Sequence, residues 1–115
     1  MKLARLGNKG KEKPIIIDKD GNYRDLSSEI SDFNSDTLNF ETLKKISKIN
    51  KSNLPILDKD IRIGPCVSNP SKFLGIGLNY KDHALEQNMP IPKEPIIFSK
   101  FTSSISGPND DIEIP

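Results

Sequence analysis

A short β-branched run that leads into an Asp-Gly turn limits the possible folds of this chain strongly. Residues 14–17 (Pro-Ile-Ile-Ile) favour an extended strand, and Asp20 and Gly21 stand shortly before Tyr23. Asp-Gly is typical of a type I′ hairpin turn, in which both central residues need a positive φ. With a further strand expected over residues 2–6, the pattern predicts a small antiparallel sheet at the N-terminal end.

A helix is expected next to this sheet. Apolar residues recur there at three-residue steps with lysines between them, as in an amphipathic helix: Phe40, Leu43, Ile46 and Ile49. Short extended segments are expected over residues 54–57 and 61–63. Gly and Pro punctuate residues 64–70, where we place a domain boundary. The predicted organisation is a small α+β leader domain over residues 1–68 and a second domain over residues 69–115.

The second domain is expected to place a helix between two strands. Residues 72–77 favour a buried strand, after which Asn79 is suited to cap a helix with Asp82 at its third position. Asn88 and Pro90 are expected to end this helix after about two and a half turns. The segments predicted downstream are a stiff proline-rich stretch (89–95), a strand (95–100), a turn (106–110) and a further strand (111–114).

Composition and charge argue against several classes of function. The chain has 115 residues, of which 34% are hydrophobic and 6% aromatic, so its core is modest. The formal net charge of +1 gives no electrostatic argument for nucleic acid or a membrane surface as partner. Cys66 is the only cysteine, which excludes an internal disulfide and a Cys-based zinc site. No run approaches membrane-spanning length, and we expect a cytoplasmic protein.

The residues best suited to catalysis lie in and around the predicted helix. His83, the only histidine, stands three residues before Glu86, a spacing that puts both side chains on one side of a helix. A neutral imidazole beside a carboxylate is suited to taking a proton from water. Tyr80 lies about one turn earlier and is a candidate to line the same pocket. The alternative is that His83 and Glu86 are ordinary solvated residues of a helix surface.

Three other patterns also have two interpretations. Lys100 follows a predicted strand and either presents its ammonium group to an anionic substrate or is a solvated lysine. Gly75 and Gly77 do not form a dinucleotide-binding motif, because Tyr80 occupies the third glycine position; they allow the backbone to pass close to another element. The carboxylates of residues 110–113 are of the type that binds a hard cation, but in a Pro-Asn-Asp-Asp turn we expect them to be turn formers.

Residues 69–115 resemble the fumarylacetoacetate hydrolase family. Three ordered blocks carry the resemblance: residues 73–86 (Phe-Leu-Gly-Ile-Gly-Leu-Asn-Tyr-Lys-Asp-His-Ala-Leu-Glu), residues 89–100 (Met-Pro-Ile-Pro-Lys-Glu-Pro-Ile-Ile-Phe-Ser-Lys) and residues 106–115 (Ser-Gly-Pro-Asn-Asp-Asp-Ile-Glu-Ile-Pro). Residues 1–70 are similar to the small α+β leader of many bacterial members. Within the family, the chain is most similar to ureidoglycolate lyases and to hydrolases of 2,4-diketo sugar acids.

The resemblance implies a fold, a reaction and a cofactor. The second domain would be the first part of a β-rich roll, usually found in homodimers. A divalent cation (Mg²⁺, Mn²⁺ or Ca²⁺) would hold a keto-acid or ureido-acid substrate and stabilise the enolate left when a C–C bond breaks. The family's Tyr-x-x-His-Ala-x-Glu motif falls on His83 and Glu86, which would activate water on a short lid helix. Lys100 matches a family lysine, although Phe101 stands where many members have proline.

The resemblance assigns no metal ligand to this chain, because the family's metal-binding carboxylates lie in a segment downstream of residue 115. We therefore expect the N-terminal part of a longer metal-dependent hydrolase or lyase, inactive by itself. Its substrate would be a small keto acid or a ureidoglycolate-like compound, with cleavage of a C–C or ureido C–N bond. The alternative is a non-catalytic binding or dimerisation module of the same family.

Overall fold

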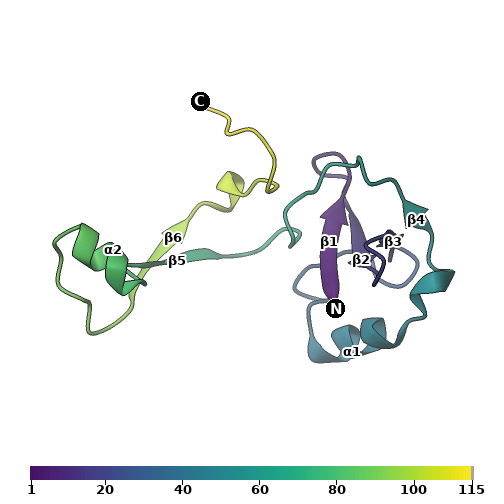
Figure 1. The fold of residues 1–115 in the computed structure, drawn as a ribbon, viewed down its shortest axis with the longest axis horizontal. Helices are drawn as coiled ribbons and strands as arrows, with labels where there is room; N and C mark the ends of the chain where they lie inside the picture. The colour runs from purple at the N-terminus through teal and green to yellow at the C-terminus, as the bar shows by residue number, and fades with distance from the viewer. Residues whose placement is uncertain (115) are drawn as a thin grey trace. The chain divides into compact units, whose positions relative to one another are not determined.

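The computed structural model describes residues 1–114. These form two compact units, one made of Met1–Pro70 with the segment that begins at Ile105, the other of Ser71–Ser104 (Figure 1). Both units combine antiparallel strands with helical segments, which confirms the predicted α+β class. These compact units do not test the predicted domain boundary at residue 68, which stays a prediction.

A four-stranded antiparallel sheet forms the centre of the larger unit. Its strands follow one another in chain order: β1 (Lys2–Leu6), β2 (Lys13–Ile17), β3 (Tyr23–Asp25) and β4 (Ile56–Leu57). Leu3 lies opposite Ile16 in the first pair, and Ile17 lies opposite Tyr23 in the second. The predicted N-terminal sheet and its hairpin return are thereby confirmed.

The loop between β2 and β3 is wider than the predicted type I′ turn. Gly21 has a φ of 77°, and no non-glycine residue of this loop has a positive φ. The Asp18 N–H donates to the Asn22 carbonyl at 3.0 Å, so three residues lie between this pair. The side chain of Asp18 accepts from the N–H groups of Asn22 and Asp20 and from Arg24. These hydrogen bonds, led by that from Asn22, hold the pKa of Asp18 well below its usual range and stabilise the wider loop.

Helix α1 (Phe40–Lys48) confirms the predicted amphipathic helix. The side chain of Asn39 caps it by accepting from the Thr42 N–H at 2.9 Å. Ile46 is fully buried, whereas Phe40, the first residue of the apolar series, is 94% exposed. A short 3₁₀ helix, Lys51–Asn53, follows. The core of this unit joins the sheet, the helix and the loops between them: Ile16, Leu26, Ile30, Phe33, Ile46 and Leu54.

The smaller unit consists of an antiparallel strand pair that flanks a helix. Strand β5 (Phe73–Gly77) pairs with β6 (Ile96–Lys100), and helix α2 (Lys81–Glu86) lies between them in the chain. A 3₁₀ turn, Thr102–Ser104, follows. Both strands and the helix are present as predicted. Within residues 1–114, no helix is both long and apolar enough to cross a bilayer.

Two predictions about this half of the chain are wrong. Strand β5 was expected to be buried, but its residues are half-exposed or exposed because, among the described residues, its sheet contains only β6. Residues 111–114 were expected to form a strand, but they form none. An alternating sequence becomes a strand only where a neighbouring strand satisfies its backbone groups, and residues 1–114 supply no such neighbour for it.

Candidate functional site

Helix α2 carries the pair of residues expected to transfer a proton. It begins at Lys81, its N-cap is Tyr80, and no side chain caps its first turn. The prediction that Asn79 caps this helix is therefore wrong. Leu78 has a φ of 47°, and after this turn the chain enters the helix one residue later than the capping pattern requires.

The C-terminal end of α2 closes in a Schellman motif. Asn88 adopts a φ of 51°, its N–H donates to the Leu85 carbonyl at 3.0 Å, and the Met89 N–H donates to the Ala84 carbonyl at 2.9 Å. Asparagine suits this position because it tolerates the left-handed conformation better than most residues. The prediction that Asn88 ends the helix is confirmed, although the helix has six residues, fewer than expected.

His83 and Glu86 lie on the same side of α2, as their spacing predicts. The distance between His83 Nδ1 and Glu86 Oε2 is 3.9 Å, which is longer than a hydrogen bond and within reach of an ion pair when the imidazole is protonated. The side chains are 55% and 73% exposed, so solvent screens their interaction. The arrangement can orient an imidazole beside a carboxylate, and its catalytic role stays a prediction.

Tyr80 and Lys100, the two expected substrate-binding residues, are both exposed. Tyr80 is 76% exposed at the start of α2. Lys100 lies at the end of β6, where its Nζ is 6.0 Å from the centroid of the Phe98 ring, at the outer limit of a cation–π contact. The structure leaves the side chains accessible for a ligand, and their substrate-binding roles stay predictions.

The glycines of β5 do allow a close approach. Gly75 lies opposite Phe98, and a Cβ atom on Gly75 would be 2.5 Å from Phe98 Cζ. A Cβ atom on Gly77 would meet the Ile96 Cβ at 3.4 Å, an ordinary contact. Only Gly75 is therefore needed for packing, because the aromatic ring of the opposite strand covers its backbone.

The described residues hold no preassembled metal site. Among residues 1–114, no group of three or more His, Cys, Asp or Glu side chains is arranged to bind an ion. Asp110 forms the predicted turn, since its carboxylate accepts from the Gly107 N–H at 2.6 Å and its own N–H donates to the Gly107 carbonyl. Glu113 pairs with Lys9 on the surface at 3.2 Å.

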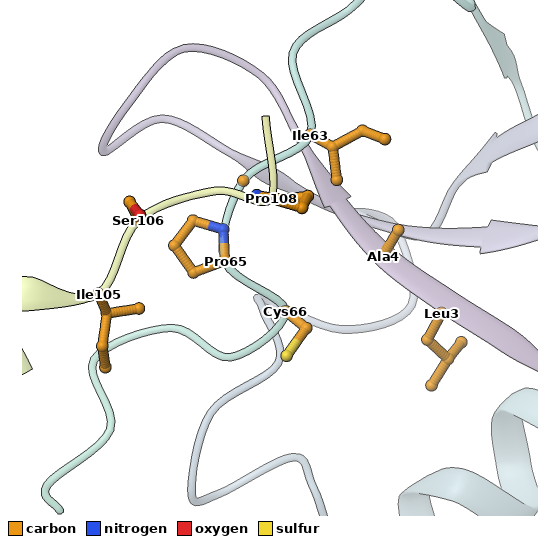
Figure 2. Close-up of a pocket in the computed structure, with 9 residues that line it drawn as sticks. Leu3, Ala4, Ile63, Pro65, Cys66, Ile105, Ser106 and Pro108 are labelled. Atoms are coloured by element: carbon orange, nitrogen blue, oxygen red, sulfur yellow. The ribbon is translucent and has the colours of Figure 1, made fainter. Parts of the chain in front are cut away.

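Two features of the larger unit are not predicted by the sequence. One is a network of ion pairs centred on Glu12, which joins residues up to 50 positions apart in the chain. The other is a cavity of about 350 Å³ with mainly apolar walls (Figure 2). Its lining comes from β1, from the chain around Pro65 and from the segment after Ile105: Leu3, Ala4, Ile63, Gly64, Pro65, Cys66, Ile105, Ser106 and Pro108.

Comparisons with known proteins test the family resemblance. Residues 72–115 match the model described as fumarylacetoacetate (FAA) hydrolase, C-terminal. Proteins from Burkholderia lata and Burkholderia ambifaria are each 52% identical to this chain over all 115 of its residues, and one from Burkholderia multivorans is 51% identical. Their names describe each as a "Putative hydrolase", and the chain spans 41% of the length of each. The predicted resemblance to the fumarylacetoacetate hydrolase family is thus confirmed over residues 72–115.

Proposed function

We propose that this chain is part of a metal-dependent hydrolase or lyase in which His83 and Glu86 activate water. The observation that carries the proposal is the placement of an imidazole 3.9 Å from a carboxylate on one helix, inside the segment that matches the family model. The names of the relatives support a hydrolase-type reaction. In the complete enzyme, β5, α2 and β6 would form the first part of a β-rich roll.

The proposed chemistry uses each exposed side chain in a distinct way. His83 would take a proton from water, and Glu86 would stabilise the imidazolium that results. Because both side chains are more than half exposed, each can change rotamer and shorten the 3.9 Å separation to a hydrogen bond. The ammonium group of Lys100 would bind the carboxylate of a small keto or ureido acid, and the Tyr80 ring would bound the site.

A divalent cation (Mg²⁺, Mn²⁺ or Ca²⁺) would supply the remaining chemistry, as a Lewis acid that stabilises negative charge on the substrate. The described residues offer no cluster of three ligands, so we expect the carboxylates that hold the cation to lie outside residues 1–114. We further propose that the enzyme acts in the cytoplasm as a homodimer. Neither its substrates nor its partners would include nucleic acid or a membrane.

A non-catalytic binding or dimerisation module is the second candidate. The exposure of both His83 and Glu86 favours it, because a proton-transfer pair works best where water is excluded. The two hypotheses differ in metal binding, since a module of this kind needs no cation. Calorimetric titration of the full-length protein with Mg²⁺ and Mn²⁺ therefore separates them.

The deciding experiment is turnover of the full-length protein on 2,4-diketo acids and ureidoglycolate, with and without added Mg²⁺. Replacement of the imidazole in His83→Ala should lower kcat by about 100-fold or more. Asp82→Asn, on the same helix and also exposed, serves as the matched control and should retain the wild-type rate. Wild-type turnover in His83→Ala would reject the assignment of this residue. A protein that binds no cation and turns over none of these substrates would instead be the module.

A further inference from the structure

A continuous chain of ion pairs runs through the larger unit. Arg5, on β1, binds both carboxylate oxygens of Asp32, at 2.7 and 2.8 Å. Glu12 accepts from the same guanidinium group at 3.4 Å and from Arg62 at 2.8 Å. Arg62 in turn binds both carboxylate oxygens of Asp110, at 2.7 and 2.6 Å. Three carboxylates and two guanidinium groups therefore alternate in one network, with Glu12 at its centre.

Glu12 is well shielded from solvent. Its side chain is 4% exposed and that of Arg5 is 7% exposed. The Gly10 N–H donates to Glu12 Oε2 at 3.1 Å, so both oxygens of this carboxylate are hydrogen-bonded. Burial raises the pKa of Glu12, but hydrogen bonds and the charges of Arg62 and Arg5 outweigh it and leave this pKa below its usual value. Glu12 is therefore an ionised carboxylate whose charge is shared between two arginines.

The network contacts both segments from which residues 71–104 depart. We call residues 64–68 the first stem and residues 105–110 the second stem. Arg5 holds the first stem, because its guanidinium donates to the Pro65 carbonyl at 3.2 Å and its own carbonyl accepts from the Gly64 N–H at 2.8 Å. Arg62 holds the second stem through its bidentate pair with Asp110. Among residues 1–114, Glu12 is the one residue that forms ion pairs with both arginines.

Each stem carries a glycine where it meets the network. A Cβ atom on Gly64 would lie 2.6 Å from Glu12 Cγ, so the side chain of Glu12 occupies the space that any larger residue would need. A Cβ atom on Gly107 would overlap the carbonyl oxygen of Ile63 and would lie 2.9 Å from the Asp110 carboxylate. The close approach of both stems to the network thus depends on the absence of side chains at these two positions.

We propose that Glu12 joins the two stems into a single clamp that holds both of them on the N-terminal sheet. Without the Glu12 charge, Arg5 and Arg62 would be neighbouring cations that no longer share an anion. Each arginine would then bind its stem less strongly. The second stem also forms one wall of the apolar cavity through Ile105, Ser106 and Pro108 (Figure 2). Release of this stem would therefore remove one wall of the cavity. The clamp is independent of any catalytic role of His83 and Glu86.

Hydrogen exchange with mass spectrometry on the full-length protein tests the clamp. The informative peptides cover residues 62–70 and 105–112, and a peptide from β2 reports global opening. Glu12→Gln keeps the shape of the side chain and removes its charge, so exchange should become about tenfold faster in both stems while β2 is unchanged. Asp110→Asn should accelerate only the second stem, because Arg5 and Glu12 still hold the first.

Lys9→Gln is the matched control. It removes a pair to Glu113 in the same C-terminal segment, but both partners are more than 70% exposed, so exchange in the stems should stay at the wild-type level. If Glu12→Gln leaves both stems at the wild-type rate, or accelerates only one, the proposed coupling is wrong. If Glu12→Gln accelerates exchange in β2 as well, the variant has opened the whole unit, and Arg62→Lys becomes the deciding variant. Lysine keeps the positive charge but cannot form the bidentate pair with Asp110. Faster exchange confined to the second stem in that variant supports the clamp, and unchanged exchange overturns it.

Discussion

Arg62 binds both carboxylate oxygens of Asp110 across 48 residues of sequence, at 2.7 and 2.6 Å. Such bidentate pairs are directional, because the planar guanidinium group matches the two carboxylate oxygens. Asp110 also accepts from the Gly107 N–H within its own turn. One side chain therefore stabilises a local turn and fixes that turn to a distant segment of the same unit.

Acid should weaken this pair. Hydrogen bonds from Arg62, with the backbone bond and nearby positive charges, lower the pKa of Asp110 from 3.8 to about 2. A carboxylate with a lowered pKa in the folded state contributes stability above about pH 4 and loses it as the pH falls through about 2. As the pH falls from about 4 to about 2, Asp110→Asn should therefore lose less stability than the wild type. Denaturant midpoints measured at several pH values would show this, and parallel curves for the two proteins would contradict it.

The two phenylalanines of the larger unit should differ sharply in their contribution to stability. Phe33 is 1% exposed in the core, so Phe33→Ala should lower the free energy of unfolding by about 3–5 kcal/mol through lost burial and a residual cavity. Phe40 is 94% exposed at the start of α1, and Phe40→Ala should change it by no more than about 0.5 kcal/mol. Chemical unfolding of both variants measures the difference. Equal losses would mean that this core is not the one described.

Gly75 should tolerate substitution less well than Gly77. A methyl group on Gly75 must displace the far end of the partly exposed Phe98 ring, so Gly75→Ala should cost about 1 kcal/mol, whereas Gly77→Ala adds only an ordinary contact. The double variant Gly75→Ala with Phe98→Leu should recover part of the loss, because the smaller side chain leaves room for the methyl group. Hydrogen exchange in β5 and β6 reports the effect. No recovery in the double variant would show that the ring is not the cause.

Two substitutions of Asn88, at the C-terminal end of α2, should have opposite effects. Asn88 has a φ of 51°, so Asn88→Ala should destabilise the helix end by about 1 kcal/mol through backbone strain. Asn88→Gly should be neutral or stabilising, because glycine adopts this conformation without a Cβ clash. Protection of the Met89 N–H, which donates to the Ala84 carbonyl, is the measurement. Equal protection in the two variants would argue against the left-handed cap.

Local patterns predicted the elements of this chain well. The β-branched run before the Asp18–Asn22 loop became β2, and the three-residue apolar steps around Ile46 became α1. Both patterns depend on residues within a few positions of one another, so the elements can be recognised without a partner. The approach of His83 to Glu86 follows in the same way, because helix geometry alone brings residues three apart together.

Burial could not be predicted in the same manner. The strand pattern of residues 72–77 predicts burial, yet within the described part of the chain β5 has only β6 beside it and stays largely exposed. The alternation at residues 111–114 was interpreted as a strand, yet nothing among the described residues pairs with it. Apolar spacing indicates which side chains favour burial, but only neighbouring elements decide whether they are covered.

The amino-acid sequence by itself determined the strands of the N-terminal sheet, both helices, the family resemblance and the spacing of the candidate proton-transfer pair. Only the tertiary structure brought Arg5, Glu12 and Arg62 together and placed Asp110 at the end of their network. The physical reason is the sequence separation of the residues that interact. Hydrogen bonds within a helix or a hairpin join near neighbours and leave a periodic signal, whereas ion pairs between residues about 50 positions apart leave none.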